Sequence, residues 1–152
     1  MATVLTNNHY PSGSVCQVVY GWAQQNNSTI SAGNSSDITY YTLSFTPKFP
    51  NSFCIYETTI TGQTSSDGGY VRFSLKDNVT GDTLHSNANA SYIAASGYTH
   101  TEWIDIPIRS HFIPQHTNAM TINLRATAIT GDFASNWSSG DYRLMTVTEI
   151  AQ

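Results

Sequence analysis

Charged residues are scarce in this sequence. Lys, Arg, Asp and Glu together account for 11% of the 152 residues, less than half of the roughly 25% that is usual in soluble domains. The formal net charge is −4, and the six basic residues are scattered along the chain. No basic patch is therefore present for the phosphates of a nucleic acid. Sparse ionisable residues also disfavour an enzyme, because active sites depend on titratable groups with shifted pKa values.

Cysteine is rare, and the sequence has no long apolar run and no secretion signal. Cys16 and Cys54 are the two cysteines, and without a Cys-x-x-Cys spacing they predict no zinc or redox site. We expect them to be two small buried residues, with a disulfide bridge as the alternative. No apolar run approaches the roughly 18 residues of a membrane span. The first residues carry neither the basic nor the apolar region of a signal peptide.

What the sequence does contain is an alternation of apolar residues with Ser, Thr and Asn. Ser and Thr alone make up about a quarter of the chain. A period of two, interrupted by turn residues such as Asn51 and Ser52, is typical of half-buried antiparallel strands. The predicted strands are residues 15–22, 41–46, 53–61, 71–76, 83–86, 103–108, 120–127 and 142–150.

This pattern predicts an all-β fold, an antiparallel two-sheet β-sandwich of the jelly-roll type. We expect an extended N-terminal arm over residues 1–13 and one sandwich domain over residues 14–152. Polar loops are predicted at 24–37 and 131–140. Pro107, inside a predicted strand, indicates the edge of a sheet or a bulge.

Candidate catalytic and metal-binding groups are few. The histidines His85, His100, His111 and His116 have no nucleophile elbow nearby, and Pro114 prevents a helical pairing of the last two. Asp77, Asn78 and Asp82 offer oxygens for Ca²⁺, but a hairpin turn with an Asx cap is the expected explanation for them. We therefore predict no catalytic residue, metal or cofactor.

Aromatic and arm residues are the more promising candidates for a binding site. Aromatic rings can stack on the apolar faces of sugars, and four of them lie in or near predicted loops. Packing of these rings in the core or against another subunit is the expected role, and sugar binding is the alternative. In the arm, three apolar residues could clasp a neighbouring subunit. The candidate aromatics are Tyr92, Tyr98, Trp103 and Trp137, and the candidate arm residues are Val4, Leu5 and Tyr10.

Four segments carry a resemblance when they are taken in order. They are SGSVCQVV (12–19), LSFTPKFPNSF (43–53), VRFSL (71–75) followed by Gly81-Asp82, and RLMTVTEIA (143–151). The set resembles a β-sandwich module of the virion proteins of tailed bacteriophages, with its GxVxQVV opening, ITPKxxxSKIxV middle and LTVMEIA end. The resemblance covers residues 12–151. Phe53-Cys54 departs from the usual Lys-Ile, and residues 87–101 do not align.

The resemblance implies a non-enzymatic surface protein of the virion, assembled in the host cytoplasm as a homotrimer. Two roles follow from it. One is a decoration or cement protein that contacts the major capsid protein, and the other is a tail-fibre tip that joins a fibre shaft and binds a host-surface receptor or glycan. If the chain is full length, its arm of at most 13 residues before the sandwich makes the decoration role the expected one; if it is an excised domain, the tail-fibre role is expected.

Overall fold

The computed structural model describes residues 10–24, 28–65, 69–85, 103–135 and 142–152. These residues form ten β-strands and no helix, so no helix that could cross a membrane is found among them. The strands are β1 (Val15–Gln24), β2 (Ser28–Ile30), β3 (Ser35–Phe45), β4 (Phe53–Thr64), β5 (Tyr70–Asp77), β6 (Thr83–His85), β7 (Ile104–Phe112), β8 (Met120–Thr130), β9 (Phe133–Ser135) and β10 (Tyr142–Ile150). The predicted all-β class is confirmed.

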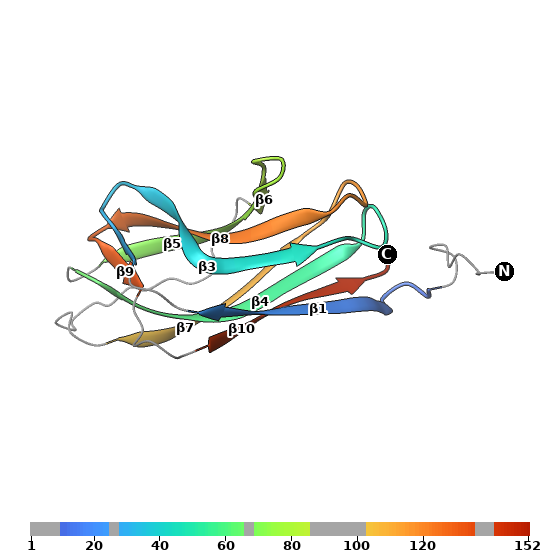
Figure 1. Cartoon of the computed structure of the whole chain (residues 1–152), viewed down its shortest axis with the longest axis horizontal. Coiled ribbons are helices and arrows are strands. Elements are labelled where there is room, and N and C mark those ends of the chain that lie inside the picture. Colours follow the sequence, from blue (N-terminus) through green and yellow to red (C-terminus); the bar gives the residue numbers. More distant parts are fainter. Residues whose placement is uncertain (1–9, 25–27, 66–68, 86–102, 136–141) are drawn as a thin grey trace.

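Two antiparallel sheets form the layers of a sandwich (Figure 1). The six-stranded sheet runs β1-β10-β4-β9-β2, and β7 pairs with β4 beside this path. The four-stranded sheet runs β3-β8-β5-β6. Since β1 contacts β3 across the two layers, these two edge strands form one side of the sandwich. The predicted two-sheet arrangement is therefore confirmed.

The core lies between the sheets and is built from the inward-facing residues of each strand. β5 shows the pattern most clearly, because Val71, Phe73 and Leu75 are buried while Arg72 is exposed. The rings of Phe45 and Phe112 meet edge to face at 6.0 Å, and so do those of Phe73 and Phe133 at 5.6 Å, a favoured aromatic geometry. The alternation seen in the sequence thus separates core from surface.

Most predicted strands are observed, and two predicted loops are wrong. β10 covers the predicted residues 142–150, and β7, which carries Pro107, pairs with β4 alone among the described strands. The segment 24–37 contains β2 and the start of β3, and the segment 131–140 contains β9. β2 and β9 pair with each other, and β9 also pairs with the end of β4. Strands of three residues are too short to show a period of two.

Candidate functional site

The outer face of the six-stranded sheet exposes large apolar side chains. On β1, Val18, Tyr20 and Trp22 alternate outward and are 54%, 68% and 61% exposed. On β10, Tyr142 and Leu144 are 59% and 44% exposed, and Leu144 lies opposite Trp22 in the ladder. We call these five residues the apolar face. Contiguous exposed apolar residues of this kind usually mark a contact with another molecule.

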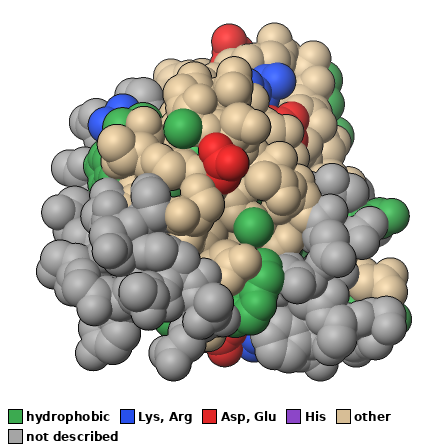
Figure 2. All heavy atoms as spheres, turned by 90° about the vertical axis from the view of Figure 1, so that its left-hand side faces the viewer, with side chains coloured by type: hydrophobic (Ala, Val, Ile, Leu, Met, Phe, Trp, Pro, Cys, Tyr) green, Lys and Arg blue, Asp and Glu red, His purple; other side chains and the backbone are tan. Residues whose placement is uncertain are grey.

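The outer face of the four-stranded sheet is mainly polar instead. Its outward residues on β5 are Arg72, Ser74 and Lys76, and Ser74 lies opposite Arg125 of β8. Arg125 forms an ion pair with Asp37 of β3 at 3.3 Å. Figure 2, which shows one end of the sandwich, likewise has mostly uncharged polar side chains and backbone on its described surface. The four-stranded sheet also exposes Tyr40 of β3 and Ile129 of β8, but among the described residues the larger apolar group lies on β1 and β10 of the six-stranded sheet.

β1 is also an unprotected edge. Among the described strands it pairs with β10 alone, and its sequence, VCQVVYGWAQ, contains no charged residue and no proline. Natural edge strands usually carry such residues, which prevent pairing with a second chain. An apolar edge of ten residues is therefore suited to association with another protein.

A shallow hollow opens on the same side of the molecule, with a volume of ≈ 460 Å³. Its lining residues come from three neighbouring strands: Trp22, Glu57, Thr58, Thr59, Tyr142, Arg143, Leu144 and Thr146. Glu57 pairs with Arg109 at 3.3 Å. Arg143 donates hydrogen bonds to Asp105 at 2.9 Å and to the Thr61 hydroxyl at 2.8 Å. The hollow thus combines aromatic rings with fixed charges and hydroxyl groups.

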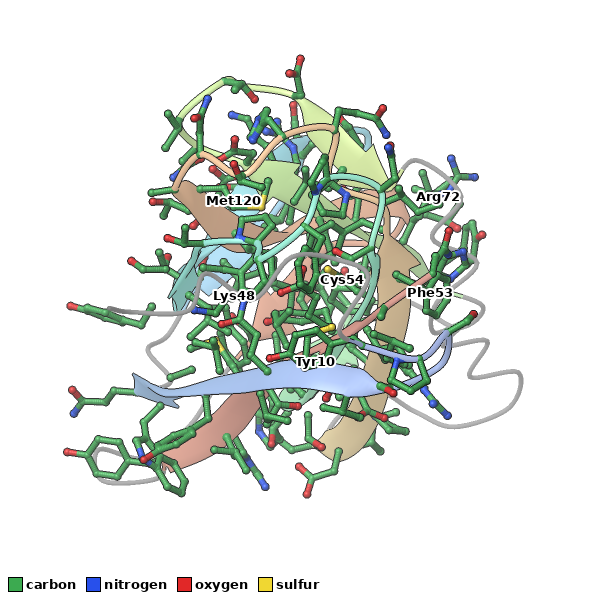
Figure 3. The ribbon with its side chains drawn as sticks, turned by 90° about the vertical axis from the view of Figure 1, so that its right-hand side faces the viewer. Tyr10, Lys48, Phe53, Cys54, Arg72 and Met120 are labelled. Atoms are coloured by element: carbon green, nitrogen blue, oxygen red, sulfur yellow. The ribbon has the colours of Figure 1, made fainter. Side chains whose placement is uncertain are left out.

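At the other end of the β1–β10 ladder, the buried carboxylate of Glu149 ties several segments together. Its Oε1 accepts hydrogen bonds from the Phe49 N–H at 3.0 Å and the Ser52 hydroxyl at 2.7 Å. Its Oε2 accepts from Gln17 Nε2 at 2.6 Å, and both oxygens lie within reach of the Lys48 N–H. Figure 3 looks onto this end of the sandwich and labels Lys48. Glu149 is 0% exposed, so these donors take the place of water around its carboxylate.

The Glu149 cluster explains why the motifs of the sequence occur together. Gln17 belongs to the opening segment, residues 48–52 belong to the middle segment, and Glu149 belongs to the last one. Asn51, at the turn, has φ +65°, a conformation that Asn tolerates better than most residues. These three segments of the resemblance therefore meet in one buried hydrogen-bond cluster.

Asp77 is the second buried carboxylate, and it caps the β5–β6 hairpin. It accepts hydrogen bonds from the N–H groups of Val79 and Thr121, both at 3.0 Å, and from the Thr80 hydroxyl at 3.1 Å. Burial opposes ionisation of Asp77, but these hydrogen bonds outweigh it and hold its pKa below the ordinary value. This geometry favours the capped turn over the Ca²⁺ site, because the carboxylate oxygens already bind the backbone.

This cap gives the protein an acid-sensitive contribution to stability. Because the pKa of Asp77 is lowered in the folded state, its contribution is present above the unfolded pKa and is lost as the pH falls through the folded one. We expect Asp77→Asn to cost about 1–2 kcal/mol near pH 7, and the difference from wild type to shrink below about pH 4. Urea unfolding over a pH series measures it, with exposed Asp82→Asn as the control. A difference that is the same at pH 7 and pH 3 contradicts the prediction.

The aromatic residues predicted from the sequence are placed as follows. Trp103 lies just before β7 and is 37% exposed, and it does not line the hollow. Tyr92, Tyr98 and Trp137 lie outside the described residues. The sequence prediction did not include Trp22 and Tyr142, which the structure exposes. In the sequence, each lies among the alternate residues of its strand that face outward. The structure shows that these two strands, β1 and β10, are neighbours.

The arm candidates are only partly described. Val4 and Leu5 lie outside the described residues. Tyr10 packs edge-on against Phe49 of its own chain, with the ring centroids 5.5 Å apart. The Gly13 N–H donates to the Ala151 carbonyl at 2.8 Å. The chain is therefore held against the sandwich at this point, and a clasp formed by residues 1–9 stays a prediction.

The cysteines and histidines form no reactive site in the part of the chain that the structure describes. Cys16 is half-buried, Cys54 is buried and both are free. Burial raises the pKa of the Cys54 thiol to about 12, so that it stays protonated at neutral pH. His111 stacks on Phe53 at 5.2 Å, while His100 and the side chain of His85 are not among the described parts. No three potential metal ligands come together among the described residues.

No family model matches this sequence, and no curated protein is significantly similar to it. Solved structures do share its fold. The VP2 subviral particle of infectious bursal disease virus matches 91% of this chain at 14% identity with a TM-score of 0.54. Structures of the Gx and Gt strains of that virus match 91% at 14% and 11% identity, with TM-scores of 0.54 and 0.51.

This likeness concerns the fold. The chain spans about a third of the length of the viral chains it matches, since it covers 34%, 33% and 38% of them. At these identities the shared feature is a β-sandwich of the kind found in a viral particle, in agreement with the predicted jelly-roll class.

Proposed function

We propose that this protein is a non-enzymatic structural component of the virion of a tailed bacteriophage. In this proposal it forms a homotrimer that decorates or cements the capsid and contacts the major capsid protein. The observation that carries the proposal is the difference between the two outer faces. One sheet presents the apolar face and the uncharged edge strand β1, while the outer face of the other sheet is mainly polar.

Self-association along the first part of β1, through Val18 and Tyr20, is the simplest way to cover this edge. Burial of apolar area contributes roughly 25 cal/mol per Å², and obligate subunit interfaces resemble a domain core more than a protein surface. The acidic groups beside the apolar face are paired, Glu57 with Arg109 and Asp105 with Arg143. Two copies can therefore approach along β1 with little repulsion between like charges.

Two further observations support a structural role. The fold is shared with a protein of a viral particle. In addition, the buried carboxylates of Glu149 and Asp77 are bound by hydrogen-bond donors of their own chain, so neither is available as a general acid or base. Both observations favour a protein that contacts other proteins.

A charge placed on β1 tests the trimer. We expect the wild-type protein to have three times its chain mass of 16.7 kDa in native mass spectrometry at micromolar concentration. Tyr20→Asp should give a folded monomer, because it puts an unpaired carboxylate into the interface. Ser74→Asp places the same charge on the polar outer face and should leave the trimer intact. A wild-type protein that is monomeric at this concentration contradicts the trimer.

Imaging of the virion tests the location. Under the proposal, a cryo-image of the particle shows the protein's density on the capsid lattice. Density confined to the tail rejects the decoration role and favours the second candidate, a tail-fibre tip that binds a host-surface receptor or glycan. The observation that favours this second candidate is the hollow between Trp22 and Tyr142.

A further inference from the structure

We propose that the hollow lined by Trp22 and Tyr142 is a saccharide-binding site that takes one pyranose ring or a short glycan. The site goes beyond the proposed capsid role. It gives the tail-fibre candidate a place for its glycan, and it is tested independently of both roles. It also differs from the loop aromatics predicted from the sequence, since it lies on the strands β1, β4 and β10.

The aromatic residues supply the stacking surface. Trp22 and Tyr142 are 61% and 59% exposed, although aromatic side chains on strands usually bury most of their area. The face of an aromatic ring carries partial negative charge. It attracts the polarised C–H groups on the apolar face of a pyranose, which lies flat on such a ring. Leu144, opposite Trp22 in the ladder, extends the apolar floor.

The polar residues of the hollow match the hydroxyl groups at the edge of a sugar. The carboxylate of Glu57 accepts hydrogen bonds, the guanidinium of Arg143 donates them, and the hydroxyls of Thr59 and Thr146 do both. Ion pairs hold the two charged groups in place, Glu57 with Arg109 and Arg143 with Asp105. A few fixed polar groups around an aromatic floor are the usual composition of a small-ligand site.

The shape and charge of the hollow favour a sugar over other ligands. Its volume of ≈ 460 Å³ lies within the roughly 300–1,000 Å³ of ligand sites. Glu57 and Arg143 bring one charge of each sign, so a phosphate group or a nucleotide gains little electrostatic attraction. The neutral, amphipathic surface of a pyranose suits this mixture of rings, hydroxyls and paired charges.

The hollow lies beyond the part of β1, Val18 and Tyr20, that the proposed interface uses. Val15 pairs with Ile150 at one end of the β1–β10 ladder, and Trp22 pairs with Leu144 toward the other. A trimer that packs on the first part of β1 leaves the hollow open. The oligomeric state and the binding of sugar can then be measured separately.

Saturation-transfer NMR on the full chain tests the site. The probes are the methyl pyranosides of glucose, galactose, mannose and N-acetylglucosamine, each up to tens of millimolar. We expect saturable transfer to at least one of them with a millimolar Kd. Trp22→Ala should weaken it by about tenfold or more, and so should Tyr142→Ala. Trp103→Ala, which truncates a tryptophan outside the hollow, should leave it unchanged.

Three results would overturn the proposal. The first is the absence of transfer to all four probes, and the second is binding that Trp22→Ala and Tyr142→Ala leave unaltered. The third is dissociation of the trimer in both variants, which would assign the hollow to a subunit contact. If the wild-type protein is monomeric and still binds a probe, the proposed trimer fails and the saccharide site stands.

Discussion

Replacing Glu149 by leucine is expected to lower the free energy of unfolding by roughly 3–5 kcal/mol. The substitution leaves the buried Phe49 N–H without its acceptor. It also removes one acceptor of the Ser52 hydroxyl, which can still donate to the Phe49 carbonyl at 3.0 Å. An orphaned donor costs about 1–3 kcal/mol, and the contacts of Gln17 and Lys48 are lost as well. Since small domains have about 5–15 kcal/mol in total, the variant should be close to unfolding at 37 °C.

Urea unfolding followed by tryptophan fluorescence measures this loss, and two variants make it specific. Glu149→Gln keeps one carbonyl oxygen for Phe49 and Ser52 but loses the acceptor of Gln17 Nε2, which still donates to the Thr46 carbonyl at 2.8 Å. We therefore expect a smaller loss of about 1–2 kcal/mol. Glu57→Leu removes an exposed carboxylate and should change stability by less than about 0.5 kcal/mol. Equal stability of the Glu149→Leu and Glu57→Leu proteins would show that the cluster contributes nothing.

The long strands were predictable because each shows its environment in its own sequence. Val71, Phe73 and Leu75 face the core between Arg72 and Ser74, which do not, and this contrast defines a half-buried strand without knowledge of its partners. The strand 142–150 was predicted with its observed bounds for the same reason. The alternation of apolar and polar residues within the segment is enough to predict strands of this kind.

The candidate surface was not predictable in the same way. Trp22 and Tyr142 are 120 positions apart, and only the β1–β10 register places them on one face. The sequence shows which residues alternate, but it does not show which apolar side of a strand faces water when both sides contain large residues. On β1, Val19 and Ala23 face the core while Tyr20 and Trp22 face outward. The sheet partners, which are non-local, determine this choice.

The sequence did not predict β9, because this short strand is stabilised by the strands that pair with it. Its three residues pair with β2 on one side and with the end of β4 on the other. Phe133 is 0% exposed and meets Phe73 edge to face, and it lies so close to Gly62 that a Cβ there would be 2.5 Å from its ring. A segment that appears to be a polar loop in the sequence thus carries one of the largest core side chains.

Phe133→Ala is accordingly expected to lower the free energy of unfolding by about 3–5 kcal/mol. The cause is the cavity left between Phe73 and Gly62, together with the loss of the contact that holds β9 on β4. Urea unfolding measures this loss too. Val79→Ala, at a position that is 66% exposed, is the control and should be nearly neutral. A Phe133→Ala protein as stable as this control would mean that β9 is not packed in the core.

A double-mutant cycle then tests whether Phe133 and Gly62 share one space. Gly62→Ala alone should cost about 1–3 kcal/mol, because the new methyl group overlaps the Phe133 ring. In the Phe133→Ala background the same methyl group enters the cavity, so its cost should fall by at least about 1 kcal/mol. Some of the cost should persist, since the Ala134 carbonyl oxygen lies 3.2 Å from the added carbon. Strictly additive losses would mean that the two residues do not touch, and that the glycine serves the backbone of β4 alone.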